Sequence, residues 1–215
     1  MPAFPDPSDP ALAVQWPLPQ AWPPQHPRLR LGVMASGDGS NFEALVQASR
    51  QGPLNAEVVV LMVNCGDCGA IARAKRLGVP WQLHDHRLHA DRASLDAALI
   101  DGFQGRGVDM VALAGWMRIV TPRLIEAFPG RLVNIHPSLL PSFRGLDAVG
   151  QALAAGVAIS GCTAHLVSEE VDAGRILVQA AVPVLAGDDR ASLAARIHRQ
   201  EHRILPLAVA LAAQG

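Results

Sequence analysis

Three polar side chains of this chain have the types needed to move an acyl group. Asn134 and His136 belong to the segment Asn-Ile-His-Pro-Ser-Leu-Leu-Pro at residues 134–141, and Asp172 follows later in Val-Asp-Ala-Gly at residues 171–174. An amide, an imidazole and a carboxylate can together polarise a carbonyl, stabilise the oxyanion that forms and transfer one proton. Because neither a serine nor a cysteine nucleophile is needed, the set predicts acyl transfer without a covalent enzyme intermediate.

Each of these residues also has an ordinary structural explanation. Asn134 could form a turn, His136 could be a buried ring with satisfied hydrogen bonds, and Asp172 could be a turn residue. The adjoining run Ser-Leu-Leu-Pro favours the chemical interpretation of all three together. Its Leu140–Pro141 bond is predicted to be cis, since a fixed tight turn beside a reactive strand is where such bonds persist. His165, on a neighbouring predicted strand, is expected to orient the set.

A glycine-rich loop offers a separate site for an anion. The segment Ser-Gly-Asp-Gly-Ser-Asn at residues 36–41 follows the first predicted strand and opens a predicted helix. Gly39 allows backbone amides to curl toward a ligand, and Ser40 or Asn41 is expected to cap the helix, whose N-terminus attracts phosphate. The loop lacks the Gly-Lys-Ser/Thr of a nucleoside triphosphate loop and the third glycine of a dinucleotide fingerprint. A plain tight turn is the alternative.

Apolar runs and helical stretches alternate after residue 28. Strands are predicted at 30–35, 57–63, 109–114 and 131–135, and helices at about 41–51, 69–77, 91–105 and 122–128. A strand at 176–182 is expected to pair with 159–167, and a helix from about 189 to 212 is expected to be interrupted near Pro206. The pattern predicts an α/β fold, a Rossmann-like open, mostly parallel twisted sheet with helices on both faces and an antiparallel edge strand. Because ligands gather at the carboxyl ends of such strands, the motifs should converge.

Composition restricts the class of protein. The chain has 215 residues, 50% of them hydrophobic, which suits one domain with a sizeable core. A net charge of −1 favours small-molecule substrates over nucleic acid or a membrane surface. No apolar run has membrane-spanning length and no secretion signal is recognisable, so a cytoplasmic location is expected. Residues 1–28 are rich in proline and are predicted to form a flexible arm ahead of the folded domain at 29–215.

Three cysteines, an odd number, argue against a secreted disulfide framework. Cys65 and Cys68 have the spacing of a metal clip or a redox pair, but no second such pair supplies the further ligands of a zinc site. A reduced loop pair is the simpler interpretation, and metal or redox use stays open. His84, His86 and His89 follow a strand-like run and are interpreted as solvated loop histidines. No metal is therefore predicted.

These motifs together resemble those of phosphoribosylglycinamide formyltransferases. The likeness covers about residues 31–208 and rests on the Asn-x-His-Pro-Ser-Leu-Leu-Pro segment with its later Asp, and on Gly-Ser-Asn at 39–41. It implies a formyltransferase fold for residues 29–215. It also implies an enzyme that takes the formyl group of 10-formyltetrahydrofolate, used as a cosubstrate, and transfers it to the amine of glycinamide ribonucleotide. That reaction belongs to purine (IMP) biosynthesis.

The same resemblance assigns roles to residues of this chain. The catalytic residues would be Asn134, His136 and Asp172. The ribonucleotide would be bound by Gly39, Ser40, Asn41, His198 and Glu201. The folate would be bound by Arg73, Met117, Arg118, Ile119, Val120, Asn134, Ser168, Glu169, Glu170, Val171 and Asp172. For His198 and Glu201, an ordinary solvated helix face is the alternative.

Other functions fit parts of this pattern. A formyltetrahydrofolate hydrolase would use the same Asn, His and Asp with water as the acceptor, but such enzymes carry a regulatory domain and lack the Gly-Ser-Asn loop. Formyltransferases acting on initiator methionyl-tRNA or on sugar nucleotides add a C-terminal domain. A non-catalytic nucleotide-binding module would make the three residues accidental. Several relatives continue past the last helix, so altered edge packing or association is expected here, and both a monomer and a homodimer stay open.

Overall fold

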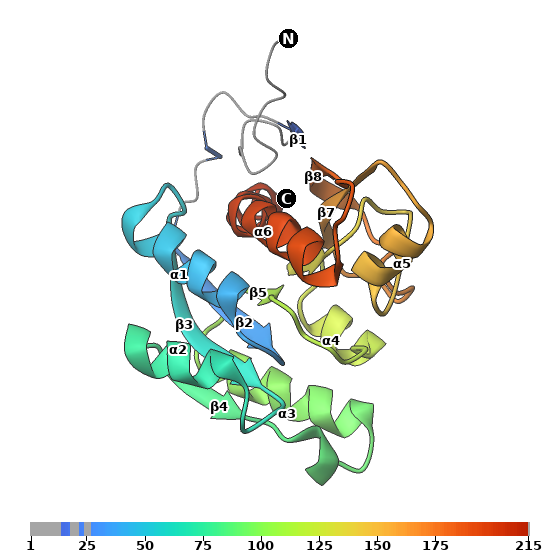
Figure 1. Cartoon of the computed structure of the whole chain (residues 1–215). Coiled ribbons are helices and arrows are strands. Elements are labelled where there is room, and N and C mark those ends of the chain that lie inside the picture. The colour runs from blue at the N-terminus through green and yellow to red at the C-terminus, as the bar shows by residue number, and fades with distance from the viewer. Residues whose placement is uncertain (1–13, 18–21, 24–26, 215) are drawn as a thin grey trace.

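A computed structural model describes residues 14–17, 22–23 and 27–214 of the chain (Figure 1). Its strands are β1 (Val14–Trp16), β2 (Leu29–Ala35), β3 (Ala56–Val63), β4 (Trp81–Leu83), β5 (Met110–Leu113), β6 (Leu132–His136), β7 (Ile159–Leu166) and β8 (Ile176–Pro183). Its α-helices are α1 (Ser40–Gln51), α2 (Gly69–Leu77), α3 (Arg92–Gln104), α4 (Pro122–Ala127), α5 (Ala148–Ala154) and α6 (Arg190–Ala212), with a 3-10 turn, η2, at His86–Leu88. The strands and helices expected after residue 28 are therefore present, most of them within one or two residues of the predicted bounds.

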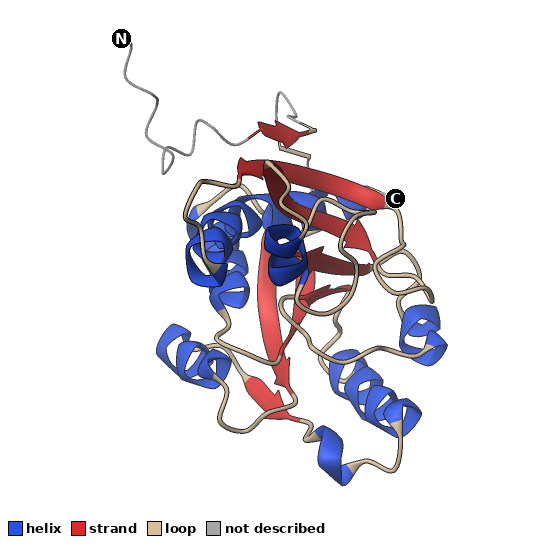
Figure 2. Ribbon diagram, turned by 45° about the vertical axis from the view of Figure 1, so that its right-hand side comes forward, coloured by secondary structure: helices blue, strands red, loops and turns tan. Residues whose placement is uncertain are grey.

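The strands form one mixed sheet, seen nearly edge-on in Figure 2, in the order β1-β8-β7-β6-β5-β2-β3-β4. β2, β3, β4, β5 and β6 are parallel, whereas β7, β8 and β1 add antiparallel pairings on one side. The parallel part follows from the helical crossovers, since parallel neighbours need a long connection. The predicted fold class is confirmed, and its antiparallel edge contains three strands.

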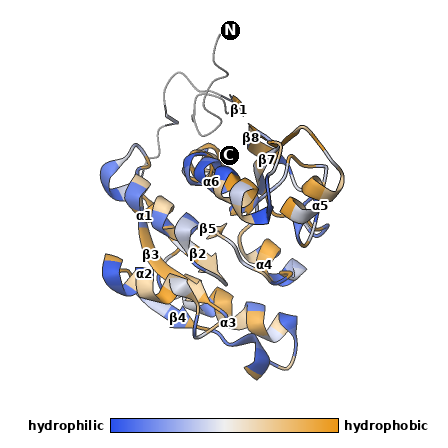
Figure 3. Cartoon of the chain, viewed as in Figure 1, coloured by the Kyte–Doolittle hydropathy of each residue, from blue (hydrophilic) through white to orange (hydrophobic). Residues whose placement is uncertain are grey.

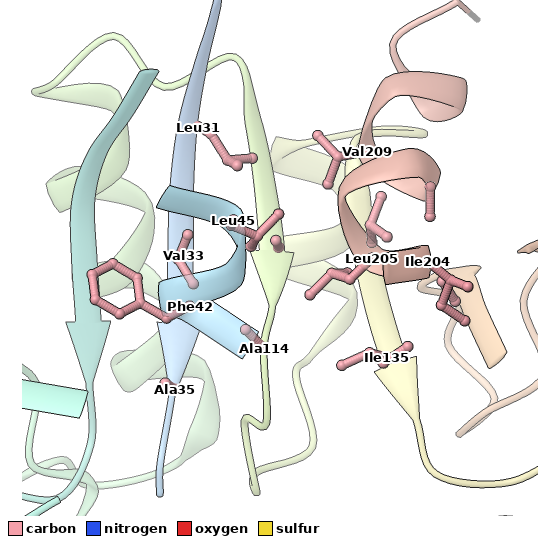
Figure 4. Close-up of a cluster of buried hydrophobic side chains, with 14 of the residues drawn as sticks. Leu31, Val33, Ala35, Phe42, Leu45, Ala114, Ile135, Ile204, Leu205 and Val209 are labelled. Carbon is pink, nitrogen blue, oxygen red and sulfur yellow. The ribbon is translucent and has the colours of Figure 1, made fainter. Parts of the chain in front are cut away.

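Alternate residues of the central strands feed two cores, one on each face of the sheet. Leu31, Val33 and Ala35 of β2 pack with α1 and α6, and Figure 4 shows Phe42 and Leu45 of α1 beside this row. On the other face, Met34 packs with α3 and α4. Full burial of a Val, Leu, Phe or Met side chain stabilises the fold by about 1.5–3 kcal/mol relative to leaving it exposed. Figure 3 shows the central strands as mostly hydrophobic, whereas hydrophobic and hydrophilic residues are mixed along the helices.

The expected interruption of the last helix near Pro206 is wrong. Helix α6 runs continuously from Arg190 to Ala212 with Pro206 inside it. Proline removes one helical hydrogen bond and crowds the preceding turn. Here Leu205, Pro206 and Leu207 are all buried among the residues of the helix's C-terminal half, and this burial on more than one side offsets the lost hydrogen bond.

The proline-rich segment contains an element that its composition did not predict. Val14–Trp16 pairs antiparallel with β8 and forms one edge of the sheet, an edge being where a chain rich in proline can still join a sheet. Trp22 packs against the core, whereas Trp16 is exposed. The remainder of the proposed arm, 1–13, 18–21 and 24–26, lies outside the described residues.

Candidate active site

The predicted catalytic residues come from β6 and from the loop between β7 and β8. Asn134 and His136 lie two residues apart at the carboxyl end of β6, so both side chains project to the same face. β7 runs antiparallel to β6 and places His165 opposite Asn134. Asp172 lies in the loop that joins β7 to β8. Strand pairing therefore brings together residues that are distant in the sequence.

The carboxylate of Asp172 lies at the centre of this cluster. Its Oδ2 is 3.3 Å from Nδ1 of His136, and its Oδ1 is 3.4 Å from Nδ2 of Asn134 and 3.6 Å from Nε2 of His165. The Asn134 amide also lies 3.1 Å from His165 Nε2. The three predicted residues thus meet as expected, together with His165.

Backbone geometry holds Asp172 in this position. Its φ of 52° is left-handed, a conformation that aspartate tolerates better than most residues, and the N–H of Gly145 donates to Oδ2 at 2.9 Å. Nearby, a Cβ on Gly174 would overlap the carbonyl oxygen of Leu166, so only glycine lets the loop approach β7 this closely. The loop is therefore fixed at both sides of the carboxylate.

Opposing effects set the ionisation of Asp172. Burial alone would raise the pKa of Asp172. The hydrogen bonds from His165 and the Gly145 N–H, together with the nearby His136 and His165 rings, lower the pKa by more than burial raises it. The net result is a pKa below the ordinary value for aspartate. Asp172 is consequently a carboxylate at neutral pH and can stabilise positive charge on an adjacent ring.

Both ring nitrogens of His136 face oxygen acceptors. Nε2 lies 2.8 Å from the carbonyl oxygen of Phe143, and Nδ1 lies 3.3 Å from Asp172. Only a doubly protonated ring can donate in both directions. The ring is buried, with 6% of its surface exposed. These two contacts fix the orientation of the ring between the Phe143 carbonyl and the Asp172 carboxylate.

The glycine-rich loop has a different cap from the one predicted. Gly39, with φ of 81°, is the N-cap of α1, and no side chain caps the helix, so the expectation for Ser40 or Asn41 is wrong. Asn41 instead donates from Nδ2 to Oε2 of Glu201 at 2.7 Å. The first amides of α1 have no intrahelical acceptors and no side-chain cap, which suits an anion.

Helix α6 contributes the other residues predicted for the ribonucleotide. Glu201 is only 3% exposed, and its burial raises its pKa despite the opposing effects of His198 and the Asn41 hydrogen bond. His198, one turn earlier, is exposed. The hydrogen bond between Asn41 and Glu201 joins α1 to α6, so the structure brings these two predicted residues together.

The segment predicted for the folate presents apolar side chains to solvent. Met117 is 63% exposed and Ile119 is 49% exposed, immediately after β5. Ser36 ties this segment to the glycine-rich loop, because the Met117 N–H donates to Ser36 Oγ at 2.9 Å and the Ser36 N–H donates to the Gly115 carbonyl. Exposed apolar side chains beside polar residues are typical of a ligand-binding surface.

The loop before Asp172 is also exposed. Val171 is 43% exposed, and Glu169 and Glu170 lie at the surface. Glu170 pairs with Arg144 at 2.6 Å, and Ser168 Oγ donates to the carbonyl of Glu170 at 2.9 Å. These contacts shape the loop and leave the side chain of Glu169 at the surface.

Arg73 is not placed with the other residues predicted for the folate. It lies on α2 and pairs with Asp38 and Glu43, on the side of the glycine-rich loop. Within the described residues, the Arg73 guanidinium donates hydrogen bonds to Asp38 and Glu43 and none to residues 117–120 or 168–172. The assignment of Arg73 to the folate remains a prediction, and its contacts with the glycine-rich loop favour the ribonucleotide as its ligand.

Two backbone groups complete the cluster and were not anticipated. The carbonyl of Phe143 and the N–H of Gly145 contact His136 and Asp172. Both belong to the segment after the cis Leu140–Pro141 bond, whose predicted isomer is confirmed. Backbone contacts carry little sequence signal; the one available here was the residue type of Gly145, which adopts a left-handed φ of 77°.

The cysteine and histidine residues weighed for metal binding do not assemble into a site. Within residues 14–17, 22–23 and 27–214, no three His, Cys, Asp or Glu side chains form a group that could hold a metal ion. Cys65, Cys68 and Cys162 are free thiols. His84, His86 and His89 are each partly exposed and lie in the connection that follows β4, as expected of loop histidines. Also, no helix in the described part of the chain is long and apolar enough to cross a membrane.

Comparison with known proteins identifies the family of the chain. Residues 29–209 match the formyl transferase family, to which the chain belongs. Within that family the chain is 37% identical to the phosphoribosylglycinamide formyltransferase of Bacillus subtilis, over 82% of this chain and 91% of the relative. The resemblance to phosphoribosylglycinamide formyltransferases inferred from the motifs is thereby confirmed, and this is the branch of the family in which the chain falls.

Solved structures and longer relatives place the chain in the same branch. The crystal structure of glycinamide ribonucleotide transformylase 1 from Symbiobacterium toebii matches with a TM-score of 0.86 and 46% identity, covering 89% of this chain and 90% of the other. The human trifunctional purine biosynthetic protein adenosine-3 is 40% identical over 87% of this chain. The chain spans 19% of the length of that trifunctional relative.

Proposed function

We propose that this protein transfers the formyl group of 10-formyltetrahydrofolate to the amine of glycinamide ribonucleotide. The products are formylglycinamide ribonucleotide and tetrahydrofolate, as a step of purine biosynthesis. The observation that carries the proposal is the contact of Asp172 with both Asn134 and His136, at the carboxyl end of β6. The family's folate dependence and the names of the relatives support the choice of donor and acceptor.

The ribonucleotide would occupy the side of the site formed by α1 and α6. The phosphate would accept hydrogen bonds from the amides at Gly39, Ser40 and Asn41, where the helix N-terminus is positive. Glu201, already oriented by Asn41, would accept hydrogen bonds from the ribose. His198 is exposed one turn away and would add a donor at the rim. Binding through these groups directs the amine toward Asp172.

The folate would lie across the exposed segment 117–120 and under the loop 168–172. Met117, Ile119 and Val171 provide apolar side chains with 63%, 49% and 43% of their surface exposed. A heterocycle covering these side chains would remove apolar area from water, while backbone groups of the segment read its polar edge. The formyl group would then lie between Asn134 and His136.

The chemistry follows from charge development on the formyl oxygen. As the amine forms a bond to the formyl carbon, the Asn134 amide and the His136 imidazolium would donate to the oxyanion, and one such donor lowers the barrier by about 3–4 kcal/mol. Their contacts with Asp172, at 3.4 and 3.3 Å, are longer than a strong charged hydrogen bond and can be exchanged for the substrate.

Proton transfer completes the balance. The attacking amine gains positive charge and loses a proton, which Asp172 would accept through a water molecule. His136 would then give a proton to the folate nitrogen as the carbon–nitrogen bond breaks. The ring regains its proton from the Asp172 side, so the enzyme returns to its starting state without a net change.

A reaction mixture tests the proposal directly. The protein is incubated with 10-formyltetrahydrofolate and either glycinamide ribonucleotide or buffer alone, and tetrahydrofolate formation is followed. Turnover only with the ribonucleotide supports formyl transfer. Equal folate release without it supports the hydrolase, in which water is the acceptor, and no turnover in either mixture supports a non-catalytic module.

We also propose that residues 29–215 are the catalytic unit and that residues 1–28 are an appended arm. Three free thiols and a phosphorylated substrate favour the cytoplasm as the place of action. Light scattering in solution distinguishes the monomer from the homodimer.

A further inference from the structure

Cys65 and Cys68 lie at the two ends of a tight turn between β3 and α2. Residues 66 and 67 form the turn, and the N–H of Cys68 points at the carbonyl of Cys65 at 3.5 Å. A β-turn brings its first and fourth Cα atoms within about 7 Å. A disulfide needs Cα atoms about 4.4–6.8 Å apart. The turn therefore holds the two thiols at a spacing that a disulfide can bridge.

Both thiols can be reached from solvent, unlike the third. Cys65 and Cys68 are partly exposed, whereas Cys162 is buried in β7. Burial raises the pKa of Cys68, and hydrogen bonds from the N–H groups of Ile71 and Ala70 partly oppose this rise. Cys65 and Cys68 are therefore the two thiols that a small-molecule oxidant can reach.

The turn leads directly into the residues that support the glycine-rich loop. Cys68 is the N-cap of α2, and the N–H of Ala70 donates to the carbonyl of Gly37 at 3.1 Å. Gly39 lies so close to the helix that a Cβ on it would be 2.7 Å from Ala70. Arg73, one turn further along α2, donates to the carbonyl of Asp38 at 2.9 Å. Any displacement of the first turn of α2 is consequently passed to residues 37–39.

We propose that Cys65 and Cys68 form a reversible redox pair, oxidised by a small-molecule disulfide, and that their disulfide weakens anion binding at residues 39–41. The long contact of 3.5 Å across the turn leaves room for it to tighten as the sulfur atoms approach bonding distance, about 2.05 Å. Tightening draws Cys68 toward Cys65 and moves Ala70 with it. The effect on binding rests on the function proposed above, whereas the disulfide itself does not.

The chemistry is thiol–disulfide exchange. The Cys65 thiolate attacks one sulfur of the reagent, the reagent's sulfur–sulfur bond breaks, and one thiolate leaves. The Cys68 thiolate then attacks the Cys65 sulfur and displaces the second thiolate. The protein dithiol loses two electrons and two protons, and the reagent is reduced to two thiols.

Two measurements test this proposal on the full chain. Reduced protein is incubated with oxidised glutathione, and its mass and free thiols are then measured. We expect a mass lower by two hydrogen atoms, with Cys162 as the one remaining thiol. With glycinamide ribonucleotide as the probe, the oxidised protein should show a KM raised by about tenfold or more, since misplacements near 1 Å can cost up to about 100-fold. A dithiol reductant should restore the KM.

Matched variants separate oxidation from its consequence. Cys65→Ser and Cys68→Ser should each retain the KM of the reduced protein after oxidised glutathione and form at most a mixed disulfide. The absence of an intramolecular disulfide in the unsubstituted chain overturns the proposal, and so does a disulfide that leaves the KM unchanged. If the reduced protein transfers no formyl group, the proposed function fails, while the mass measurement and direct ribonucleotide binding still decide the redox proposal.

Discussion

Replacing Asp172 by Asn removes one charge from the centre of the cluster while keeping its shape. The carboxylate lies 3.3 Å from the His136 ring. At an effective dielectric constant of about 20, two unit charges at this distance attract by about 5 kcal/mol. The variant loses this attraction for positive charge that develops on the ring during the reaction, and it also loses the acceptor for the amine proton. We therefore expect kcat to fall by about 100- to 10,000-fold, within the range measured for general acid–base groups.

The assay is the initial rate of tetrahydrofolate formation under saturating ribonucleotide, with ribonucleotide binding measured separately by calorimetry. Because Asp172 is not among the groups proposed to hold the phosphate or ribose, the ribonucleotide Kd should change by less than about threefold. Asp147→Asn is the matched control. Its carboxylate caps α5 and pairs with Arg190 at the surface, an arrangement in which such a change has little effect. A kcat within about threefold of the unsubstituted enzyme would refute the central role of Asp172.

Four further predictions follow from the same contacts. Gly39→Val should raise the ribonucleotide KM before it affects kcat, because its φ of 81° and the 2.7 Å approach to Ala70 exclude a side chain; an unchanged KM argues against the phosphate assignment. The pKa of Glu201 is raised in the folded state, so the stability that this carboxyl contributes is complete below its ordinary pKa near 4.3 and is lost as the pH rises through the raised value. At pH 8 the Glu201→Gln variant should therefore unfold at a higher temperature than the unsubstituted chain, yet bind the ribonucleotide more weakly. A lower unfolding temperature of the variant at pH 8 contradicts the raised pKa. Arg73→Gln should raise the KM of the ribonucleotide more than that of the folate, and the opposite order would support its assignment to the folate. Deleting residues 1–28 should leave kcat within about threefold, because Val14–Trp16 pairs at the sheet edge; a larger loss would show that the arm reaches the site.

The sequence predicted the parts of the fold that depend on hydrophobic pattern. Runs such as 57–63 and 109–114 were apolar enough to indicate strands buried on both faces, and both are present as β3 and β5. Short elements carried too little pattern. β4 (Trp81–Leu83) was indicated only as a strand-like run before His84, and α5 (Ala148–Ala154) was missed because its seven residues complete only about two helical turns.

Tertiary contacts decided the points on which the sequence misled. Ser40 and Asn41 are favourable capping types, but Asn41 makes its hydrogen bond to Glu201, 160 residues away, and Gly39 takes the cap position. Local preference cannot report a partner that lies on another element.

The parts of the candidate site that depend on a particular side chain were predictable from the sequence. The parts formed by backbone hydrogen-bonding groups were not. Asn134, His136 and Asp172 were recognisable because few residue types can replace them. The carbonyl of Phe143 and the N–H of Gly145 were not, since any residue supplies these groups. The left-handed conformation of Asp172 is likewise a property of the loop and is not visible in its residue type.

The most direct measurement is the steady-state rate of His136→Ala together with its calorimetric affinity for glycinamide ribonucleotide. His136 contacts Asp172 and Phe143, and it makes no recorded contact with residues 39–41 within the described chain. The account predicts that kcat falls by about 100- to 10,000-fold while the ribonucleotide Kd stays within about threefold. A variant that keeps its kcat, or that loses ribonucleotide binding instead, would contradict the assignment of His136 to the formyl-transfer step.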